Sequence, residues 1–256
     1  MPVLFIGHGS PMNAIEDNVW SRAFRELGGA LQAPRAILAI SAHWCTRGTF
    51  VTGNAQPDTI HDFGGFPDAL YEVRYPAPGD PALAGRVIDL LGRDVASARM
   101  DWGLDHGSWS VLRHMRPEAD CPVVQLSLDT QIAPEQHVAI GRALAPLRDE
   151  GVLILASGNI VHNLRDAFSR MHSGDAGTPL WARDFDQAVV EGLERRDPAS
   201  LCRILETDKG RVAHPSLDHY LPLLYAAGAS GDDSPAFPIE GFDLGSLSMR
   251  AVRFDH

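Results

Sequence analysis

Cysteine is scarce in this sequence, and no part of it stays apolar for long. The three cysteines, Cys45, Cys121 and Cys202, are scattered without Cys-x-x-Cys spacing, which argues against a disulfide framework and favours reduced thiols. No stretch approaches the ~20 apolar residues that a membrane-spanning helix needs. The first residues lack the basic segment and the longer apolar run of a signal peptide. We therefore expect a cytoplasmic protein with no membrane partner.

Basic residues are also in short supply. Lysine and arginine together number 22 against 33 acidic residues, for a formal net charge of −11. Such a balance argues against nucleic acid or an anionic membrane as a partner. The chain also lacks a Gly-x-Ser-x-Gly elbow, a Walker phosphate loop and a Gly-x-Gly-x-x-Gly fingerprint after its first apolar run, so the common hydrolase and nucleotide-binding motifs are missing.

Short apolar runs alternate with helical patterns along the 256 residues. Four runs predict buried parallel strands, and a fifth segment alternates like a strand; they are residues 3–6, 36–40, 123–128, 152–156 and 246–254. Helical periodicity covers residues 17–27, 80–91, 134–147 and 181–193. We predict one α/β domain over residues 1–256, with a mainly parallel or mixed central sheet covered by helices on both faces. Residues 46–81 are expected to be irregular but functional, and residues 229–237 a surface loop.

Three of the eleven histidines come soon after predicted strands. His8 follows the first strand, His43 the second, and His162 the strand at 152–156, about one helical turn beyond Asn159. In open α/β sheets ligands bind beyond the carboxyl ends of the strands, and histidine is both the commonest metal ligand and the usual acid or base near neutral pH. If the strands are parallel neighbours, these rings converge, and His8 and His43 become candidate ligands of a catalytic metal.

Two more histidines, His106 and His219, have suggestive settings. His106 lies in a glycine-punctuated loop between two tryptophans, His219 is expected to lead into a helix with Pro222 in its first turn, and His61 is either a lid residue or an ordinary loop residue. The remainder lie in surface-helix, loop or terminal contexts and are expected to have no functional role: His114, His137, His172, His214 and His256. No short zinc motif such as His-Glu-x-x-His is present, so hydrogen-bonding structural histidines remain an alternative at this point.

Six motifs stand in order along nearly the whole chain. They are Gly-His-Gly-Ser-Pro-Met at 7–12, Ser-Ala-His-Trp at 41–44, His-Asp-Phe-Gly-Gly-Phe-Pro at 61–67, Leu-Asp-His-Gly-Ser-Trp at 104–109, Ala-Ser-Gly-Asn-Ile-Val-His-Asn at 156–163 and Asp-His-Tyr-Leu-Pro-Leu-Leu-Tyr at 218–225. Together they resemble the 4,5-DOPA extradiol dioxygenase family, which belongs to the class III extradiol ring-cleavage dioxygenases.

The resemblance implies roles for particular residues. His8 and His43 match the first two metal ligands, and His219 matches a later histidine of the metal site. His162 matches the acid or base over the substrate and is also associated with the metal, while His106 matches a further active-site histidine. Many class III relatives use a glutamate as the third ligand, for which His219 stands here.

Further residues are implied around that centre. Glu240 is a distant alternative for the third ligand, and Asp105 is expected to orient His106. The segment 61–67, with His61 and Phe63, is expected to close over the substrate, and Ser10 to lie beside it.

The chemistry implied is metal-dependent opening of a catechol ring. Three protein ligands leave open positions on a six-coordinate Fe(II), of which a catechol can take two and O₂ a third. Cleavage beside the two hydroxyls gives a semialdehyde. We expect one divalent metal per chain, Fe(II) for activity and Zn(II) possible in the purified protein, with a DOPA-like or other catechol and O₂ as the small-molecule partners.

Two other functional hypotheses fit the same residues. Three imidazoles also suit a zinc-dependent hydrolase, or a non-catalytic metal-binding or partner-binding protein on the same scaffold. The sequence sets neither the natural catechol nor the oligomeric state.

Overall fold

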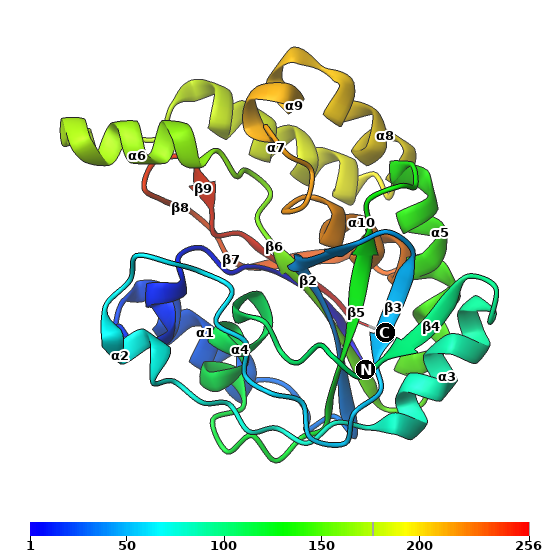
Figure 1. The fold of residues 1–256 in the computed structure, drawn as a ribbon. Coiled ribbons are helices and arrows are strands. Elements are labelled where there is room, and N and C mark those ends of the chain that lie inside the picture. Colours follow the sequence, from blue (N-terminus) through cyan, green and yellow to red (C-terminus); the bar gives the residue numbers. More distant parts are fainter. Residues whose placement is uncertain (176, 256) are drawn as a thin grey trace.

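A mixed sheet runs through the middle of the protein, as the computed structural model shows for residues 1–175 and 177–255 (Figure 1). In that part of the chain the sheet has eight strands in the order β4-β3-β5-β2-β6-β1-β10-β7. Its centre is four parallel strands, β5 (Val123–Asp129), β2 (Ala36–Thr46), β6 (Val152–Gly158) and β1 (Val3–Gly7). These are the four strands expected from the apolar runs, and they are neighbours.

The outer strands make the sheet mixed. β3 pairs antiparallel with β5 and parallel with β4, while β10 is antiparallel to both β1 and β7. A separate pair is formed by β8 and β9. The bounds of these strands are Thr49–Thr52 (β3), Ala96–Arg99 (β4), Pro235–Ile239 (β7), Phe242–Asp243 (β8), Leu247–Ser248 (β9) and Ala251–Phe254 (β10). The predicted α/β class with a mainly parallel or mixed sheet is confirmed.

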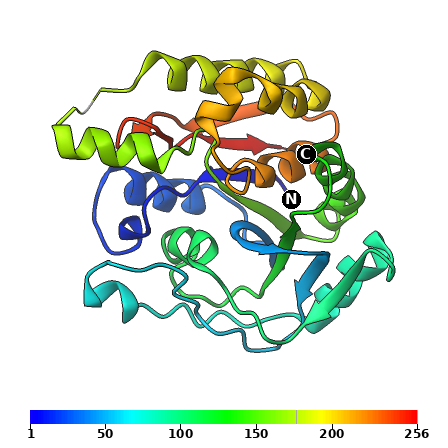
Figure 2. The same ribbon diagram turned by 45° about the horizontal axis from the view of Figure 1, so that its top comes forward.

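Helices cover both faces of this sheet (Figure 2). Because successive strand residues point to opposite faces, Val3 and Phe5 of β1 join one apolar core and Leu4 and Ile6 join the other. The first core is closed by α3 (Pro81–Leu91), α5 (Pro134–Leu144), α7 (Leu180–Glu194), α8 (Pro198–Arg203) and α10 (Leu221–Ala229). The second is closed by α1 (Val19–Gly29), α2 (Asp68–Tyr71) and α4 (His106–Met115).

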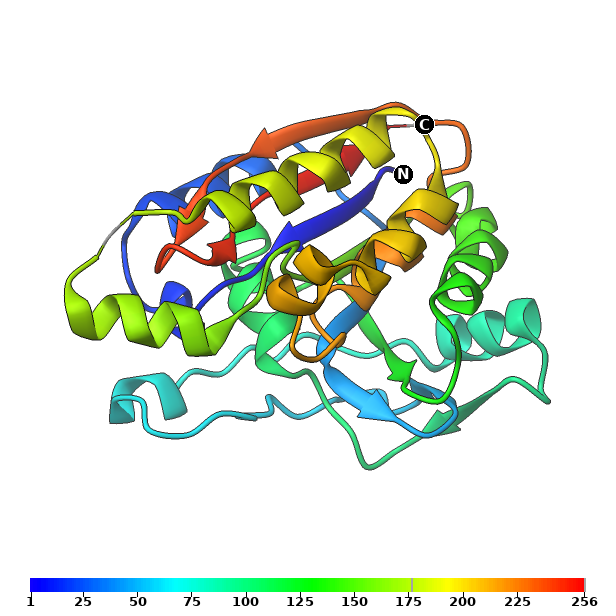
Figure 3. The same ribbon diagram turned by 90° about the horizontal axis from the view of Figure 1, so that it is seen from above.

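Shorter elements complete the chain. α6 (Leu164–Ser173) projects beside the β8–β9 pair (Figure 3). The others are α9 (Asp208–Ala213) and the 3₁₀ turns η1 (Pro11–Ala14), η2 (Ala145–Arg148) and η3 (Ile204–Glu206). Among the described residues, no helix is both long enough and apolar enough to cross a membrane.

All four predicted helices are present, and their ends have clear local causes. At α3 the Asp80 carboxylate accepts a hydrogen bond from the backbone N–H of Leu83 at 2.9 Å, and Pro81 takes the first helical position, as expected of a capping residue followed by proline. The predicted helix at 134–147 passes from α5 into η2.

Several local expectations were wrong. The segment around His106 is the start of α4 rather than a loop, because Asp105 caps it by accepting from the N–H of Ser108 at 3.2 Å. The irregular segment 46–81 contains β3 and α2. The expected loop at 229–237 includes the start of β7, an edge strand whose prolines need no ladder hydrogen bond. His162 follows an irregular turn after β6, not a helical one, since α6 begins only at Leu164.

The expected single strand at 246–254 is also divided. It forms β9 and β10 on either side of Arg250. The guanidinium of Arg250 turns inward and donates to the buried carboxylate of Asp186 at 2.7 Å. Asp186 lies in α7, so this ion pair joins the connection between the two strands to that helix.

Histidine 137 gives the fold a testable dependence on pH. Its Nδ1 lies 3.0 Å from the hydroxyl of Tyr225, and burial lowers its pKa to about 4. Between the unfolded pKa of about 6.5 and pH 4, the unfolded chain therefore holds a proton that the native ring does not. The stability that comes from the neutral ring is complete above pH 6.5 and declines as the pH falls, by at most about 1.4 kcal/mol per pH unit.

We therefore expect His137→Phe to reduce the loss of unfolding free energy between pH 6.5 and pH 4.5, as measured by urea denaturation. The control is His172→Phe, because His172 lies exposed on α6 and should leave the slope unchanged. Identical slopes for the wild type and His137→Phe would contradict the prediction.

Candidate metal centre

Five histidine rings gather at the carboxyl edge of the parallel strands. His8 follows β1, His162 follows β6, and His43 lies within β2, where the pairing with β5 shifts register between Ile40 and Cys45. His106 is the first residue of α4, and His219 comes just before α10. The expected convergence of His8, His43 and His162 is therefore present, and two helix starts add His106 and His219.

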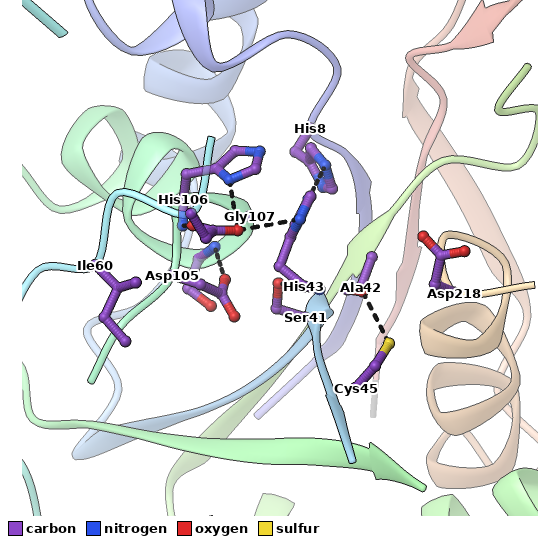
Figure 4. Close-up of polar contacts among 12 residues, drawn as sticks. His8, Ser41, Ala42, His43, Cys45, Ile60, Asp105, His106, Gly107 and Asp218 are labelled. Carbon is purple, nitrogen blue, oxygen red and sulfur yellow. Dashed lines mark hydrogen bonds and ion pairs between the residues drawn. The ribbon is translucent and has the colours of Figure 1, made fainter. Parts of the chain in front are cut away.

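The rings are in close contact (Figure 4 shows His8, His43 and His106). The Nε2 atoms of His8 and His43 lie 3.1 Å apart. The ring centre of His106 is 3.8 Å from that of His43, and the ring centre of His219 is 5.2 Å from that of His8 and 5.0 Å from that of His43. His162 stacks on His219 with centres 3.4 Å apart and an interplanar angle of 3°.

The hydrogen bonds of His8 fix which of its nitrogens is free. The Ser157 hydroxyl donates its proton to the backbone oxygen of Gly107 at 2.5 Å. It must therefore accept from the Nδ1–H of His8, which lies 2.9 Å away. The Nε2 of a neutral His8 consequently carries its lone pair toward His43.

Carboxylates fix three more rings in the same way. Asp62 Oδ2 lies 3.1 Å from Nδ1 of His43 and 2.9 Å from Nδ1 of His106, and Asp218 Oδ2 lies 2.6 Å from Nδ1 of His219. An ionised carboxylate only accepts hydrogen bonds, so each of these imidazoles bears its proton on Nδ1. In its neutral form each of these four rings offers an unprotonated Nε2, which is how proteins prepare histidines for a metal.

Burial keeps most of the cluster neutral. Burial, with the charges of neighbouring histidines, lowers the pKa of His8 and His219 well below the ordinary value and also lowers that of His106. The pKa of His162 falls to about 3 for the same reason. Neutral imidazole is the form that binds metal, so these rings are ready at pH 7.

His43 and its carboxylate partner behave differently. Burial lowers the pKa of His43, but the hydrogen bond to Asp62 and the nearby negative charges outweigh it, so the pKa rises above its ordinary value. Burial acts to raise the pKa of Asp62, yet the hydrogen bonds from His106 and His43 hold it far below its usual range. Asp62 is therefore a fixed negative charge beside the cluster.

The donor set fits one metal ion. Nitrogen atoms of His8, His43 and His106 lie within 4.8 Å of one another in a largely buried position. Imidazoles at such spacing suit Zn²⁺ or Fe²⁺. His219, the third ligand that the resemblance implied, lies beside this trio, whereas the distant alternative Glu240 pairs with Arg250 at 3.0 Å.

Sequence reasoning missed three supporting residues, Asp62, Ser157 and Asp218. Asp105, expected to orient His106, instead accepts from Ser108 and from the side chain of Gln125, and the carboxylate at Nδ1 of His106 is that of Asp62. The position of Asp62 within the motif at 61–67 was the available signal, because carboxylates commonly bind the second nitrogen of metal-bound histidines.

The three residues expected near the substrate have different partners. Phe63 packs edge-on against His106, with ring centres 5.4 Å apart. His61 donates from Nε2 to the backbone oxygen of Val73 at 3.0 Å. The Ser10 hydroxyl caps η1 by accepting from the N–H of Met12 at 3.2 Å.

The histidines expected to have no function have partners of their own. These are the backbone oxygens of Asn13, Phe168 and Ile160 for His114, His172 and His214, and the hydroxyl of Tyr225 for His137. His256 lies outside the described residues. Their lack of a functional role stays a prediction.

Known proteins resemble the whole chain. Residues 2–254 match the family described as the catalytic LigB subunit of aromatic ring-opening dioxygenase. A protein of Escherichia coli (strain K12) named 4,5-DOPA dioxygenase extradiol is 49% identical, over 99% of this chain and 94% of the relative. A protein of the same name from Beta vulgaris is 40% identical, over 98% of this chain and 95% of the relative. The crystal structure of an uncharacterised protein from E. coli K12 superposes with a TM-score of 0.86 at 44% identity and covers 100% of both chains.

Two helical glycines allow a matched test of packing around His43. A Cβ at Gly107, in α4, would overlap Ser41 Oγ and lie 2.9 Å from Cδ2 of His43, whereas a Cβ at Gly85, in α3, would meet nothing within 4 Å. We expect Gly85→Ala to stabilise the fold by about 0.5–1 kcal/mol, since alanine favours the helix. We expect Gly107→Ala to lower both the unfolding free energy and the affinity for Zn(II), as measured by urea denaturation and chelator competition. An equal increase in unfolding free energy in the two variants would show that α4 does not hold His43 tightly.

Proposed function

The chain belongs to the family of the catalytic LigB subunit of aromatic ring-opening dioxygenases, and we propose that it is a single catalytic domain that uses Fe(II) and O₂ to open the ring of a DOPA-like catechol. The observation that carries the proposal is the cluster of buried histidines whose Nε2 atoms are left free by acceptors at Nδ1. Ring opening beside the two hydroxyls places both atoms of O₂ in a semialdehyde product and needs no outside reductant.

We assign the metal to His8, His43 and His219, with His162 beside them. His8 and His43 already direct their Nε2 atoms toward one another, and Asp218 holds His219 in the matching tautomer. Bound Fe(II) would supply open positions for the two catechol oxygens and for O₂, and a path for electron density from ring to oxygen. Zn(II) suits the same imidazoles and can occupy the site in purified protein.

Two histidines remain for proton transfer and positioning. His162 is half-buried, its lowered pKa keeps it neutral, and no side-chain hydrogen bond engages its ring among the described residues. We assign it the role of taking a proton from a catechol hydroxyl and returning it as the ring opens. His106 lies against His43, with ring centres 3.8 Å apart. We assign it to hold the substrate or its oxygens by hydrogen bonds.

The aromatic segment 61–67 is assigned to the substrate. Phe63 offers an apolar edge beside His106, and His61 and Ser10 are placed at the entrance. Covering a bound catechol in this way would exclude water. The three cysteines are unpaired, which supports a reducing compartment such as the cytoplasm as the place of action.

Oxygen consumption tests the proposed reaction directly. Protein reconstituted with Fe(II) without air and then given O₂ is expected to consume O₂ and form a yellow product with DOPA, protocatechuate or simple catechol, while the Zn(II) form stays inactive because zinc has no redox chemistry. No turnover across this panel with Fe(II) bound would overturn the proposal. Hydrolysis of an ester or amide without O₂ by the zinc form would favour a hydrolase.

Replacing His162 separates proton transfer from metal binding. We expect His162→Ala to reduce kcat by about 10²–10⁴-fold, the usual contribution of a general acid or base, with the Fe(II) content kept. His172→Ala, on the exposed face of α6, is the control. Loss of iron together with activity would make His162 a ligand instead.

The third ligand can be identified by metal affinity. If His219 completes the set, His219→Ala weakens Zn(II) binding by more than the about 10–100-fold typical of a supporting residue. His106→Ala then stays within that range. The reverse order, read by chelator competition, would assign the third position to His106.

A further inference from the structure

We infer that Asp62 is a positioning residue that joins the metal centre to the aromatic segment 61–67, so that metal binding and the ordering of this segment strengthen each other. The inference rests on the metal-binding part of the proposed function. It adds a physical link between the ion and the segment assigned to cover the substrate.

A single carboxylate makes all the contacts of this link. Asp62 Oδ2 accepts from Nδ1 of both His43 and His106, at 3.1 and 2.9 Å, and Oδ1 accepts from the backbone N–H of His106 at 2.9 Å. The side chain of Asp62 is only 15% exposed, so these donors largely replace water around the charge.

The segment is well anchored just before Asp62. Ile60 donates its N–H to the backbone oxygen of Leu104 at 2.7 Å, and its own oxygen accepts from Nε1 of Trp109 at 2.8 Å. Leu104 in turn donates to the oxygen of Asp58 at 2.8 Å. Hydrogen bonds therefore hold the chain up to residue 60 against the residues just before and within the start of α4.

Beyond Asp62 the attachments are few. A Cβ at Gly64 or Gly65 would meet nothing within 4 Å, and Phe63 is held by ring packing against His106 and its aromatic neighbours. Among the described residues, the side-chain hydrogen bonds of residues 61–66 come from two residues, His61 to Val73 and Asp62 to the two imidazoles. Of these two side chains, it is Asp62 that hydrogen-bonds to rings of the metal centre.

Hydrogen-bond chemistry makes this contact two-way. By accepting at Nδ1, Asp62 keeps the lone pair of His43 on Nε2, where an ion can bind, and makes the ring a better ligand. An ion at Nε2 makes the Nδ1–H a stronger donor and so tightens the bond to Asp62. Coupling between two binding events is reciprocal, so a metal that tightens the segment must itself bind more tightly when the segment is seated.

Asparagine at this position keeps the shape but reverses half of the polarity. Its amide nitrogen only donates, so it cannot accept from both rings and from the backbone N–H of His106 as Asp62 does. If the amide oxygen faces the rings, the amide nitrogen meets that N–H, donor against donor, and the segment is displaced; if the nitrogen faces the rings, it meets the two Nδ1–H groups. In both orientations the negative charge beside the rings is lost. We expect Asp62→Asn to weaken Zn(II) binding by about 10–100-fold.

Hydrogen exchange and metal affinity, neither of which needs a catechol or O₂, test the link. In the wild type, amide exchange over residues 60–67, followed by mass spectrometry, should slow when Zn(II) is added. Asp62→Asn should lose most of this zinc-dependent protection along with the affinity. Asp58→Asn is the matched control, because Asp58 lies exposed just before the segment, and it should behave as the wild type.

Two results would overturn the inference: exchange over residues 60–67 in the wild type that is the same with and without Zn(II), or Zn(II) affinity of Asp62→Asn within twofold of the wild type. The first needs no variant, so the test stands even if Asp62→Asn folds poorly. Wild-type protein that shows the zinc-dependent protection but opens no catechol would refute the proposed function and leave this inference intact.

Discussion

The parallel pairing of β1, β6 and β2 is the constraint on which the metal centre depends. Ser157 of β6 is paired with Ile6 of β1 on one side and with Ser41 of β2 on the other. His8 and His43 each stand two residues beyond these partners, and side chains two apart in a strand share a face. The register of the sheet therefore brings both rings to the same edge, on either side of β6. A slip of one residue would turn one of them away.

Acceptors at Nδ1 convert this cluster of rings into a set of donors. Three acceptors from different parts of the chain do this: Ser157 at the end of β6, Asp62 in the long connection after β3, and Asp218 just before α10. Each fixes the tautomer of a neighbouring histidine. The carboxylates also place negative charge around a position that is largely closed to water. Because a buried cation is costly without such compensation, the same groups that orient the rings make the position suitable for a divalent ion.

Close backbone approach brings the last histidines into place. A Cβ at Gly158 would overlap the backbone oxygen of His219, and the N–H of Asn159 donates to that oxygen at 2.9 Å. The absence of a side chain at Gly158 lets the start of α10 lie directly against the end of β6. His219 and His162 can then stack, so the two elements share one small space beside His8 and His43.

Local patterns were enough to predict the four central strands, the principal helices and the histidines at the strand ends, because apolar runs, caps and strand ends are local properties of the chain. Its ordered motifs also identified the family. Three features became clear only from the folded structure. His106 is the first residue of a helix, and β7 joins the edge of the sheet although it contains prolines. Asp62 contacts two of the rings. Asp62 is separated from His106 by 44 positions. Contacts over such distances arise from the packing of whole elements, which no local pattern of residues records.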